Sequence, residues 1–424
     1  MSRIILAAVG SLGDLHPSLA IARALAERGH TPVIASHPSY RGRVEAAGVP
    51  FAPVRPDFGD SGDLKAIMKH AMHETRGSEY VVRRLVLPHL RESYADMLVA
   101  CEGADAIVTH MLSFAGSIVA EQHGLPRITQ VLQPLAMLSA YDPPIMQALP
   151  GQAFLRSLGP AVWKPLWALA RAVSRGWFHE VDALRADLGM PVLHGHPMFG
   201  AYSPLLNLAL FPSILAARQP DWPANTVVTG LCRYDRDERG EGMPQALAEF
   251  LAAGDPPIVF TLGSSGVFDA GGFYQSAADA VTALGRRAVL LVGPQPEIIA
   301  STLPPNCIAI DYAPHSELFP RAAANVHHGG IGTTGQALEA GRPMVVVPFS
   351  HDQPDNAARC ERLGVARVVP RRSVSAARLA SALRALLDDR GVVTRAAEIG
   401  AAVCREDGAR TAADAIEGAL SFTR

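Results

Sequence analysis

Short apolar runs alternate with longer amphipathic stretches along the whole chain. In the first half the apolar runs predict strands at 4–10, 31–37, 50–54, 105–110, 127–132 and 206–211. The clearest helix between them is predicted over 17–29, where Gly29 ends it. This alternation is typical of parallel sheets flanked by helices.

An irregular, charged segment interrupts the alternation at 215–245. It contains Pro220, Pro223 and the run RYDRDERGEG, a composition that favours a linker. The pattern then restarts, and strands are predicted at 257–262, 287–293, 307–312, 324–328, 343–348 and 365–370. We therefore expect an α/β protein with two doubly wound domains, over 1–222 and 223–407, and a last helix within 408–424 that packs back at the domain junction.

Composition fits a globular protein and argues against several classes. The chain has 424 residues, of which 49% are hydrophobic and 18% charged, and this is enough to bury two cores. A formal net charge of −2 without a basic stripe argues against nucleic-acid binding. Five scattered cysteines predict reduced thiols in a cytoplasmic protein. The apolar run IILAAVG lacks the flanks of a signal peptide, and no window approaches the roughly 20 apolar residues of a membrane span.

The segment HHGGIGTTGQALEAGRPMVVVPFSHDQPDNA, residues 327–357, predicts the clearest chemistry. Its glycines let backbone amides approach a ligand closely, and Thr333 or Thr334 is expected to cap a helix whose free N–H groups favour a diphosphate. Asp352 and Gln353 follow the next strand, where a carboxylate and an amide can hold sugar hydroxyls. The segment therefore predicts a nucleotide-sugar site.

Lysine is nearly absent from the chain. It occurs only at Lys65, Lys69 and Lys164, so the C-terminal half contains none. This removes a P-loop lysine and a pyridoxal-phosphate Schiff base from the predicted phosphate site.

Together with GSLGDLHPSLAIARALAERGH near the start and TLGSSG at 261–266, these motifs resemble family 1 glycosyltransferases of the GT-B fold, whose two Rossmann-like domains face each other across a cleft. The sequence is most similar to the bacterial subgroup that contains the rhamnolipid rhamnosyltransferase and antibiotic or sterol glycosyltransferases. The resemblance implies an inverting enzyme without metal or other cofactor. It would move a hexose, glucose or rhamnose, from a UDP- or dTDP-sugar to a hydroxyl of an apolar small-molecule or lipid acceptor, so it must supply a base and stabilise the leaving diphosphate.

The resemblance places the donor contacts in the C-terminal domain. The diphosphate would be bound by Gly263, Ser264, His328, Gly330, Gly332 and Thr333, and the sugar hydroxyls by Asp352 and Gln353. The nucleobase would stack and pair at Tyr312, Ala313 and His315. Tyrosine replaces the family's usual tryptophan there, which leaves uracil and thymine both open. Gln336 stands where plant members carry a ribose-binding glutamate, and Glu339 is the alternative.

Three residues of the N-terminal domain are candidates for the base. Plant members carry a histidine in G-H-x-x-P, whereas this chain has Gly13-Asp14-Leu15-His16-Pro17, so Asp14 is the first candidate. Its other interpretation is an N-cap for a helix that begins near Pro17. The aspartate that orients the plant histidine is matched here by His110. This leaves two interpretations of His110: a partner within hydrogen-bond reach of Asp14, with either residue as the base, or an unrelated histidine that lines the cleft. His16 is the third candidate.

Aromatic and basic residues alternate over 152–189. This segment predicts a helical hairpin packed on the N-terminal sheet or, alternatively, an amphipathic wall for an apolar acceptor or a peripheral membrane contact. The acceptor-binding residues expected in this domain are Gln133, Ser139 and Trp163. The histidine pairs at 70/73 and 194/196 have no third ligand placed in sequence, so no metal site is predicted.

The same residues argue against four other functions. A metal-dependent GT-A enzyme would need an acidic pair such as Asp235 and Asp237, which is expected to be solvated in the linker. A retaining GT-B enzyme usually offers a lysine near the phosphates, and the C-terminal half of this chain contains no lysine. A nucleotide-sugar 2-epimerase of this fold needs no acceptor, against which the aromatic 140–190 segment argues. A non-catalytic helper protein of a glycosyltransferase would lose the donor signature at 327–357.

Overall fold

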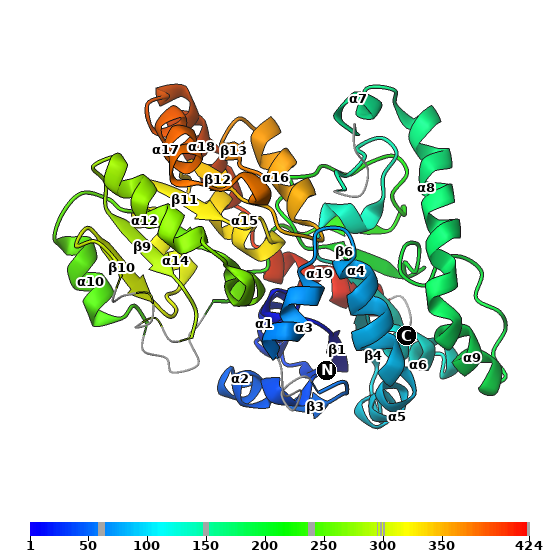
Figure 1. Ribbon diagram of the computed structural model, residues 1–424. Helices are drawn as coiled ribbons and strands as arrows, with labels where there is room; N and C mark the ends of the chain where they lie inside the picture. The colour runs from blue at the N-terminus through cyan, green and yellow to red at the C-terminus, as the bar shows by residue number, and fades with distance from the viewer. Residues whose placement is uncertain are drawn as a thin grey trace. The chain divides into compact units, whose positions relative to one another are not determined.

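The chain forms two compact units in the computed structural model, which describes residues 1–57, 64–146, 152–235, 242–294, 296, 299 and 302–421 (Figure 1). The first unit comprises Met1–Ala71, Thr75–Tyr234 and Asp407–Arg424, and the second comprises Met72–Glu74 and Asp235–Glu406. Within the described part of the chain, no helix is long and apolar enough to cross a membrane.

The first unit is built on a seven-stranded parallel sheet. Its strand order is β3-β2-β1-β4-β5-β6-β7, and the strands are β1 (Arg3–Ala8), β2 (Thr31–Ser36), β3 (Phe51–Pro53), β4 (Ala106–His110), β5 (Arg127–Val131), β6 (Leu206–Ala209) and β7 (Thr226–Val228). The main helices are α1 (Leu12–Ala26), α2 (Arg41–Ala46), α3 (Leu64–Ala71), α4 (Gly77–Tyr80), α5 (Leu90–Ala100), α6 (Phe114–Gln122), α7 (Gln152–Arg156), α8 (Pro160–Arg175) and α9 (His179–Asp187). All six strands predicted for this half are confirmed.

The seventh strand lies where the sequence predicted only a linker. β7 pairs in parallel with β6, with Leu208 opposite Val227. The short Thr-Val-Val run has the β-branched side chains that strands favour, although prolines and charges surround it. Residues 223–234 therefore belong to the first unit, and the chain leaves it after Tyr234.

The first helix begins earlier than predicted. α1 starts at Leu12, and Pro17 lies inside it. Ser11 is the N-cap: its side chain accepts from Gly13 N, while the Asp14 side chain accepts from the backbone N–H of Ser11. This reciprocal capping box starts the helix, so Asp14 is its third residue and not the N-cap of a helix at Pro17.

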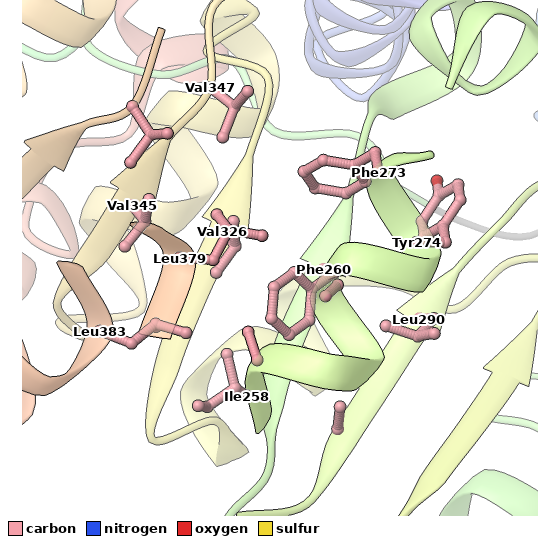
Figure 2. Close-up of a cluster of buried hydrophobic side chains, with 14 of the residues drawn as sticks. Ile258, Phe260, Phe273, Tyr274, Leu290, Val326, Val345, Val347, Leu379 and Leu383 are labelled. Carbon is pink, nitrogen blue, oxygen red and sulfur yellow. The ribbon is translucent and has the colours of Figure 1, made fainter. Parts of the chain in front are cut away.

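The second unit has a six-stranded parallel sheet in the order β10-β9-β8-β11-β12-β13. All six predicted strands are confirmed, as β8 (Ile258–Thr261), β9 (Ala288–Leu291), β10 (Cys307–Ile310), β11 (Ala324–His327), β12 (Met344–Val346) and β13 (Ala366–Val368). The helices are α10 (Gln245–Ala252), α11 (Gly263–Gly266), α12 (Phe273–Ala283), α14 (His315–Leu318), α15 (Ile331–Glu339), α16 (Gln353–Arg362), α17 (Ala376–Leu387) and α18 (Arg390–Val403). Figure 2 shows the core, in which strand residues such as Phe260 and Val345 pack with Phe273 of α12 and Leu383 of α17.

The last helix, α19 (Gly408–Ser421), packs on the first unit. Glu417 receives hydrogen bonds from Arg28 Nη1 at 2.7 Å and lies 2.9 Å from His30 Nε2. A Cβ on Gly408 would come within 2.5 Å of the Leu231 backbone, so glycine is needed for this close approach.

Each sheet reverses its strand order at one point. In the first sheet this point lies between β1 and β4, and in the second between β8 and β11. Ligands of doubly wound folds bind at the carboxyl ends of the strands at such switch points. We therefore expect the functional residues in the loops that follow these four strands.

Candidate active site

Asp14 and His110 meet at the switch point of the first sheet. His110 ends β4, Asp14 lies in the first turn after β1, and His110 Nε2 is 3.5 Å from Asp14 Oδ1. Asp14 Oδ2 accepts from the Ser11 backbone N at 2.7 Å and from Ser11 Oγ at 3.1 Å. A Cβ at Gly10, which has a φ of +130°, would stand 2.4 Å from Asp14 Oδ2. Glycine there makes room for the carboxylate.

The hydrogen bonds of His110 define its protonation. Leu112 N donates to Nδ1 at 3.5 Å, so the ring proton belongs on Nε2, which faces Asp14. Burial lowers the pKa of His110, against an opposing effect of Asp14, and keeps the imidazole neutral. The His110 side chain is 2% exposed and that of Asp14 is 24% exposed. Asp14 is therefore the member of the pair that a hydroxyl from solvent can reach.

Tyr40 supports this pair and was not singled out from the sequence. Its hydroxyl donates to the Gly10 carbonyl at 3.2 Å, and its ring stacks on His37 at 4.8 Å. Burial, followed by the charge of Asp14, raises the pKa of Tyr40 to about 12, so it remains a donor. No sequence motif marks Tyr40, because only the fold brings it under the β1 turn.

Gln133 and His16, which were also predicted for this unit, each contact another side chain. The half-buried Gln133 contacts Met111, next to His110, through Nε2 at 3.5 Å from Sδ. The ring of His16 faces that of Tyr234 at 5.5 Å.

The acceptor role predicted for Ser139 and Trp163 does not fit their surroundings. Ser139 is 3% exposed, and its hydroxyl donates to Asp221 at 2.7 Å. Trp163 is 1% exposed and donates to the Leu155 carbonyl at 3.0 Å. Both side chains are therefore buried and hydrogen-bonded within the first unit, and neither offers a free polar group to an acceptor.

In the second unit, a glycine turn carries His327 and His328 at the carboxyl end of β11. Gly329 N donates to His327 Nδ1 at 3.1 Å, which holds the turn. The ring of His328 lies between two glycines: a Cβ at Gly263 would be 2.4 Å from its Cε1, and a Cβ at Gly330 would be 2.5 Å from its Nε2. Glycine is therefore required at both positions to seat the imidazole.

The helix that follows has an open N-terminus. α15 begins at Ile331 with Gly330 as N-cap, and no side chain caps it. The predicted caps, Thr333 and Thr334, are wrong because the helix starts before them. Its first-turn N–H groups remain available to an anion.

Unsatisfied polar atoms lie around this N-terminus. Among the described residues, His328 Nδ1, Thr334 Oγ1 and Gln336 Oε1 are buried without a hydrogen-bond partner. Burial lowers the pKa of His328 to about 4, so the ring is neutral and can donate from one nitrogen. A Cβ on Gly332 would meet nothing within 4 Å, so no protein atom requires glycine there. These features together predict a bound anion that approaches close to the backbone.

The loop after β12 is tied to the glycine turn by Asn356. This fully buried side chain donates from Nδ2 to Asp352 Oδ2 at 2.6 Å and to the Gly329 carbonyl at 2.9 Å. Gln353 is 4% exposed, and its Oε1 accepts from the backbone N of Phe349 at 2.8 Å. The amide oxygen therefore holds the loop, and only Nε2 is left for a ligand. The sequence signal for Asn356 was its i+4 spacing from Asp352 on one helix face.

The residues predicted to hold a nucleobase follow β10. The Tyr312 hydroxyl donates to the Asp235 carbonyl at 2.9 Å, Ala313 is buried, and His315 stacks on Phe319 at 4.3 Å. Ser264 is exposed at the start of α11, after β8, and Glu339 is half-buried near the end of α15.

Asp235 is not the solvated linker residue that was predicted. Its carboxylate accepts from the backbone N of Ser316 at 2.7 Å and from Ser316 Oγ at 3.2 Å. Asp237 lies outside the described residues. Among the residues described, no group of three histidine, cysteine, aspartate or glutamate side chains is placed to hold a metal ion.

Two family models and several known relatives match this chain. Residues 4–141 match the glycosyltransferase family 28 N-terminal domain, and residues 276–412 match the C-terminal domain of proteins like erythromycin biosynthesis protein CIII. The chain is 31% identical to O-mycaminosyltylonolide 6-deoxyallosyltransferase of Streptomyces fradiae, covering 98% of this chain and 97% of that one. It is also 31% identical to vancomycin aglycone glucosyltransferase of Amycolatopsis orientalis, covering 99% and 98%.

More distant relatives extend the comparison. The chain is 28% identical to the sterol 3-beta-glucosyltransferase of Pichia angusta, but it spans only 34% of that enzyme's length. Among solved structures, the glycosyltransferase of kitacinnamycin superposes with a TM-score of 0.73 at 24% identity, covering 99% of both chains. The calicheamicin glycosyltransferase CalG4 gives 0.73 at 20% identity, covering 99% of this chain and 98% of that one. These superpositions establish the fold.

Proposed function

This protein belongs to the family 1 glycosyltransferases of the GT-B fold, and we propose that it moves a hexose from a UDP- or dTDP-sugar to a hydroxyl of an apolar small molecule, with inversion and without a bound metal. One observation carries the proposal: each sheet has an ordered polar cluster at its switch point. The first cluster contains a carboxylate that can accept a proton. The second offers an anion the free N–H groups of a helix start and the His328 ring, which has an unsatisfied nitrogen.

Donor binding is assigned to the second unit. The diphosphate lies against the first-turn N–H groups of α15, with His328 as a neutral hydrogen-bond donor. Asp352, held by Asn356, accepts from the sugar hydroxyls. Tyr312 and Gln336 contribute to the nucleobase and ribose contacts, and the two base types remain to be separated by experiment.

Acceptor activation is assigned to the first unit. Asp14 takes the proton of the acceptor hydroxyl as that oxygen bonds to the anomeric carbon and the bond from this carbon to the diphosphate oxygen breaks. Attack from the face opposite the leaving group inverts the configuration. His110 Nε2–H faces Asp14 Oδ1 at 3.5 Å and stabilises its negative charge, while the helix N-terminus and His328 stabilise the charge on the leaving diphosphate.

The names of the relatives indicate the class of acceptor. The relatives are named for O-mycaminosyltylonolide, vancomycin aglycone and sterols, so their acceptors all differ, while two are named for glucose and one for 6-deoxyallose. We therefore carry over only the shared class, a hydroxyl on a natural product scaffold.

Thermal unfolding with candidate donors tests this function. UDP, dTDP, UDP-glucose and dTDP-rhamnose are compared with and without a chelator, with NAD as the control. A ligand present at 100 times its dissociation constant adds about 2.7 kcal/mol to the free energy of unfolding. We expect a shift with one nucleotide that the chelator leaves unchanged. A protein that shifts with none of the four is not a nucleotide-sugar enzyme, and donor turnover without any acceptor would indicate an epimerase.

A further inference from the structure

Helix α8 has an outward face that is almost entirely apolar. Its inward face buries Trp163 and Trp167 against Leu138 and Ala140. Apart from Lys164, its exposed residues are Ala161, Pro165, Ala168, Leu169, Ala172 and Val173. Leu169 is 61% exposed and Val173 is 70% exposed. A helix on the surface of a globular protein normally turns polar residues outward, so this face indicates a partner.

The charges of α8 are all positive and lie along one edge of that face. The helix contains Lys164, Arg171 and Arg175 and no acidic residue. Their spacing of seven and four residues places them in one row beside the apolar face. Arg175 is paired with Asp182 at 2.7 Å. Lys164 Nζ lies 5.5 Å from the centre of the Tyr141 ring. Within the described residues, neither Lys164 nor Arg171 makes an ion pair, so no carboxylate neutralises these two charges.

We infer that this apolar face and its basic edge dock on an anionic lipid surface, with the apolar row at the headgroup boundary and the cations against the lipid phosphates. A helix with an apolar face bordered by lysine and arginine is the form that lies in a membrane interface. The attraction comes from this local edge, because the net charge of the whole chain is −2.

A second copy of the chain fits this face less well. A helix of 16 residues is about 24 Å long, and one face about 10 Å wide offers roughly 240 Å², far below the roughly 800 Å² per partner of a stable interface. The inference concerns where the protein acts, and it stands independently of the proposed function.

Co-sedimentation of the full chain with lipid vesicles tests the inference. We expect binding to phosphatidylcholine vesicles that contain phosphatidylglycerol, weaker binding to phosphatidylcholine alone, and a loss of the difference at high salt. L169E/V173E should lower the partition coefficient at least about tenfold by charging the apolar row. K164Q/R171Q should lower it about fivefold for each cation, only on anionic vesicles.

The matched control is V99E/V192E. Val99 and Val192 are 66% and 75% exposed in the same unit, so this variant adds the same charge at apolar surface positions outside α8 and should bind as the parent does. Circular dichroism melts confirm that each variant folds.

Three outcomes would overturn the inference: no binding of the parent protein to anionic vesicles, equal losses in L169E/V173E and V99E/V192E, or a dimer in sedimentation velocity that L169E/V173E dissociates. The nucleotide-induced thermal shift should be the same in all these variants, which separates this test from that of the proposed function.

Discussion

Asp14 has two roles, and each of its two carboxylate oxygens serves one of them. Oδ2 accepts hydrogen bonds from Ser11 in the capping box, whereas Oδ1 lies 3.5 Å from His110 Nε2. The helix therefore fixes the carboxylate without using the oxygen that would take a proton. This division explains how one residue can both start α1 and serve as a base.

Replacing Asp14 by asparagine separates these tasks. D14N should lower kcat by about 10²–10⁴-fold, the usual contribution of a positioned general base. The melting temperature should change little, because an asparagine oxygen can still accept from Ser11 N. Initial rates of sugar transfer and a thermal melt measure both quantities.

The control makes the same exchange at another helix start. D389N changes the N-cap of α18, which accepts from Gly391 N and Val392 N, and should leave turnover unaffected. For His110, H110N keeps an N–H donor and should retain more activity than H110A. Turnover of D14N within a few-fold of the parent would remove Asp14 as the base, and equal rates for the two His110 variants would remove its positioning role.

Three histidines of the second unit make its stability depend on pH. Burial lowers the pKa of His327 to about 3 and those of His315 and His328 to about 4. The unfolded protein takes up these protons below a pKa of about 6.5, whereas the folded protein does not, so stability is full above that pH and falls as pH drops toward 4. We expect each histidine to cost about 2 kcal/mol between about pH 7 and pH 5, measured by urea unfolding at a series of pH values.

Two variants separate the effect of these histidines on stability from the effect of carboxylates, which also titrate at low pH. H315Q should flatten the dependence of stability on pH, whereas H123Q, at an exposed position of the first unit, should leave it unchanged. Parallel curves for H315Q and the parent would show that His315 is not held neutral by burial.

At the scale of the element, α15 contains a glycine that the protein itself does not need. Gly332 lies in the first turn, and an alanine methyl there would meet no atom within 4 Å. Glycine in a helix costs about 1 kcal/mol relative to alanine, so its presence indicates that a ligand comes close to the backbone.

The G332A variant should therefore gain stability and lose donor binding. We expect up to about 1 kcal/mol of added stability and at least a tenfold weaker nucleotide affinity, since the methyl occupies the approach to the N–H groups. Isothermal titration with the nucleotide that stabilises the parent gives the affinity. G418A in α19, where a Cβ also meets open space, should gain stability without changing affinity. Unchanged affinity in G332A would move the anion away from this helix start.

The elements were predictable where burial sets the sequence pattern. Strands covered on both faces are continuous apolar runs, so twelve were found at nearly their observed positions. β7 was missed because three residues between two prolines on one side and a charged run on the other give too short a pattern. The start of α1 was misplaced because Pro17 suggested a first turn, while the capping box of Ser11 and Asp14 decided it.

Side-chain roles were predictable only when a motif fixed them. Asp14 and His110 lie 3.5 Å apart because both follow strands that flank the switch point, although His110 Nε2 makes no hydrogen bond. Ser139 and Trp163 turned inward, and Tyr40 was overlooked, because their contacts depend on packing between segments far apart in the sequence. Periodicity places a residue on an element but does not say what covers it.

At the scale of the whole molecule, the chain changes unit more than once. Met72–Glu74 already belong to the second unit, and the chain enters that unit again at Asp235 and returns to the first at Asp407. The neighbouring helices α18 and α19 therefore belong to different units. All four tryptophans, Trp163, Trp167, Trp177 and Trp222, lie in the first unit. Tryptophan fluorescence therefore reports the unfolding of that unit alone.

This division predicts opposite outcomes for two isoleucines that are close in sequence. Ile416 of α19 is fully buried in the first unit, and Ile399 of α18 is 6% exposed in the second. Each truncation to alanine should cost about 2–5 kcal/mol in its own unit, because a buried side chain is replaced by a cavity. I416A should lower the urea midpoint seen by tryptophan fluorescence, whereas I399A should leave that midpoint in place and lower the midpoint of the second unit, which far-ultraviolet circular dichroism also reports. If I399A shifts the fluorescence midpoint as far as I416A does, the two units unfold as one, and the last helix stabilises the whole molecule.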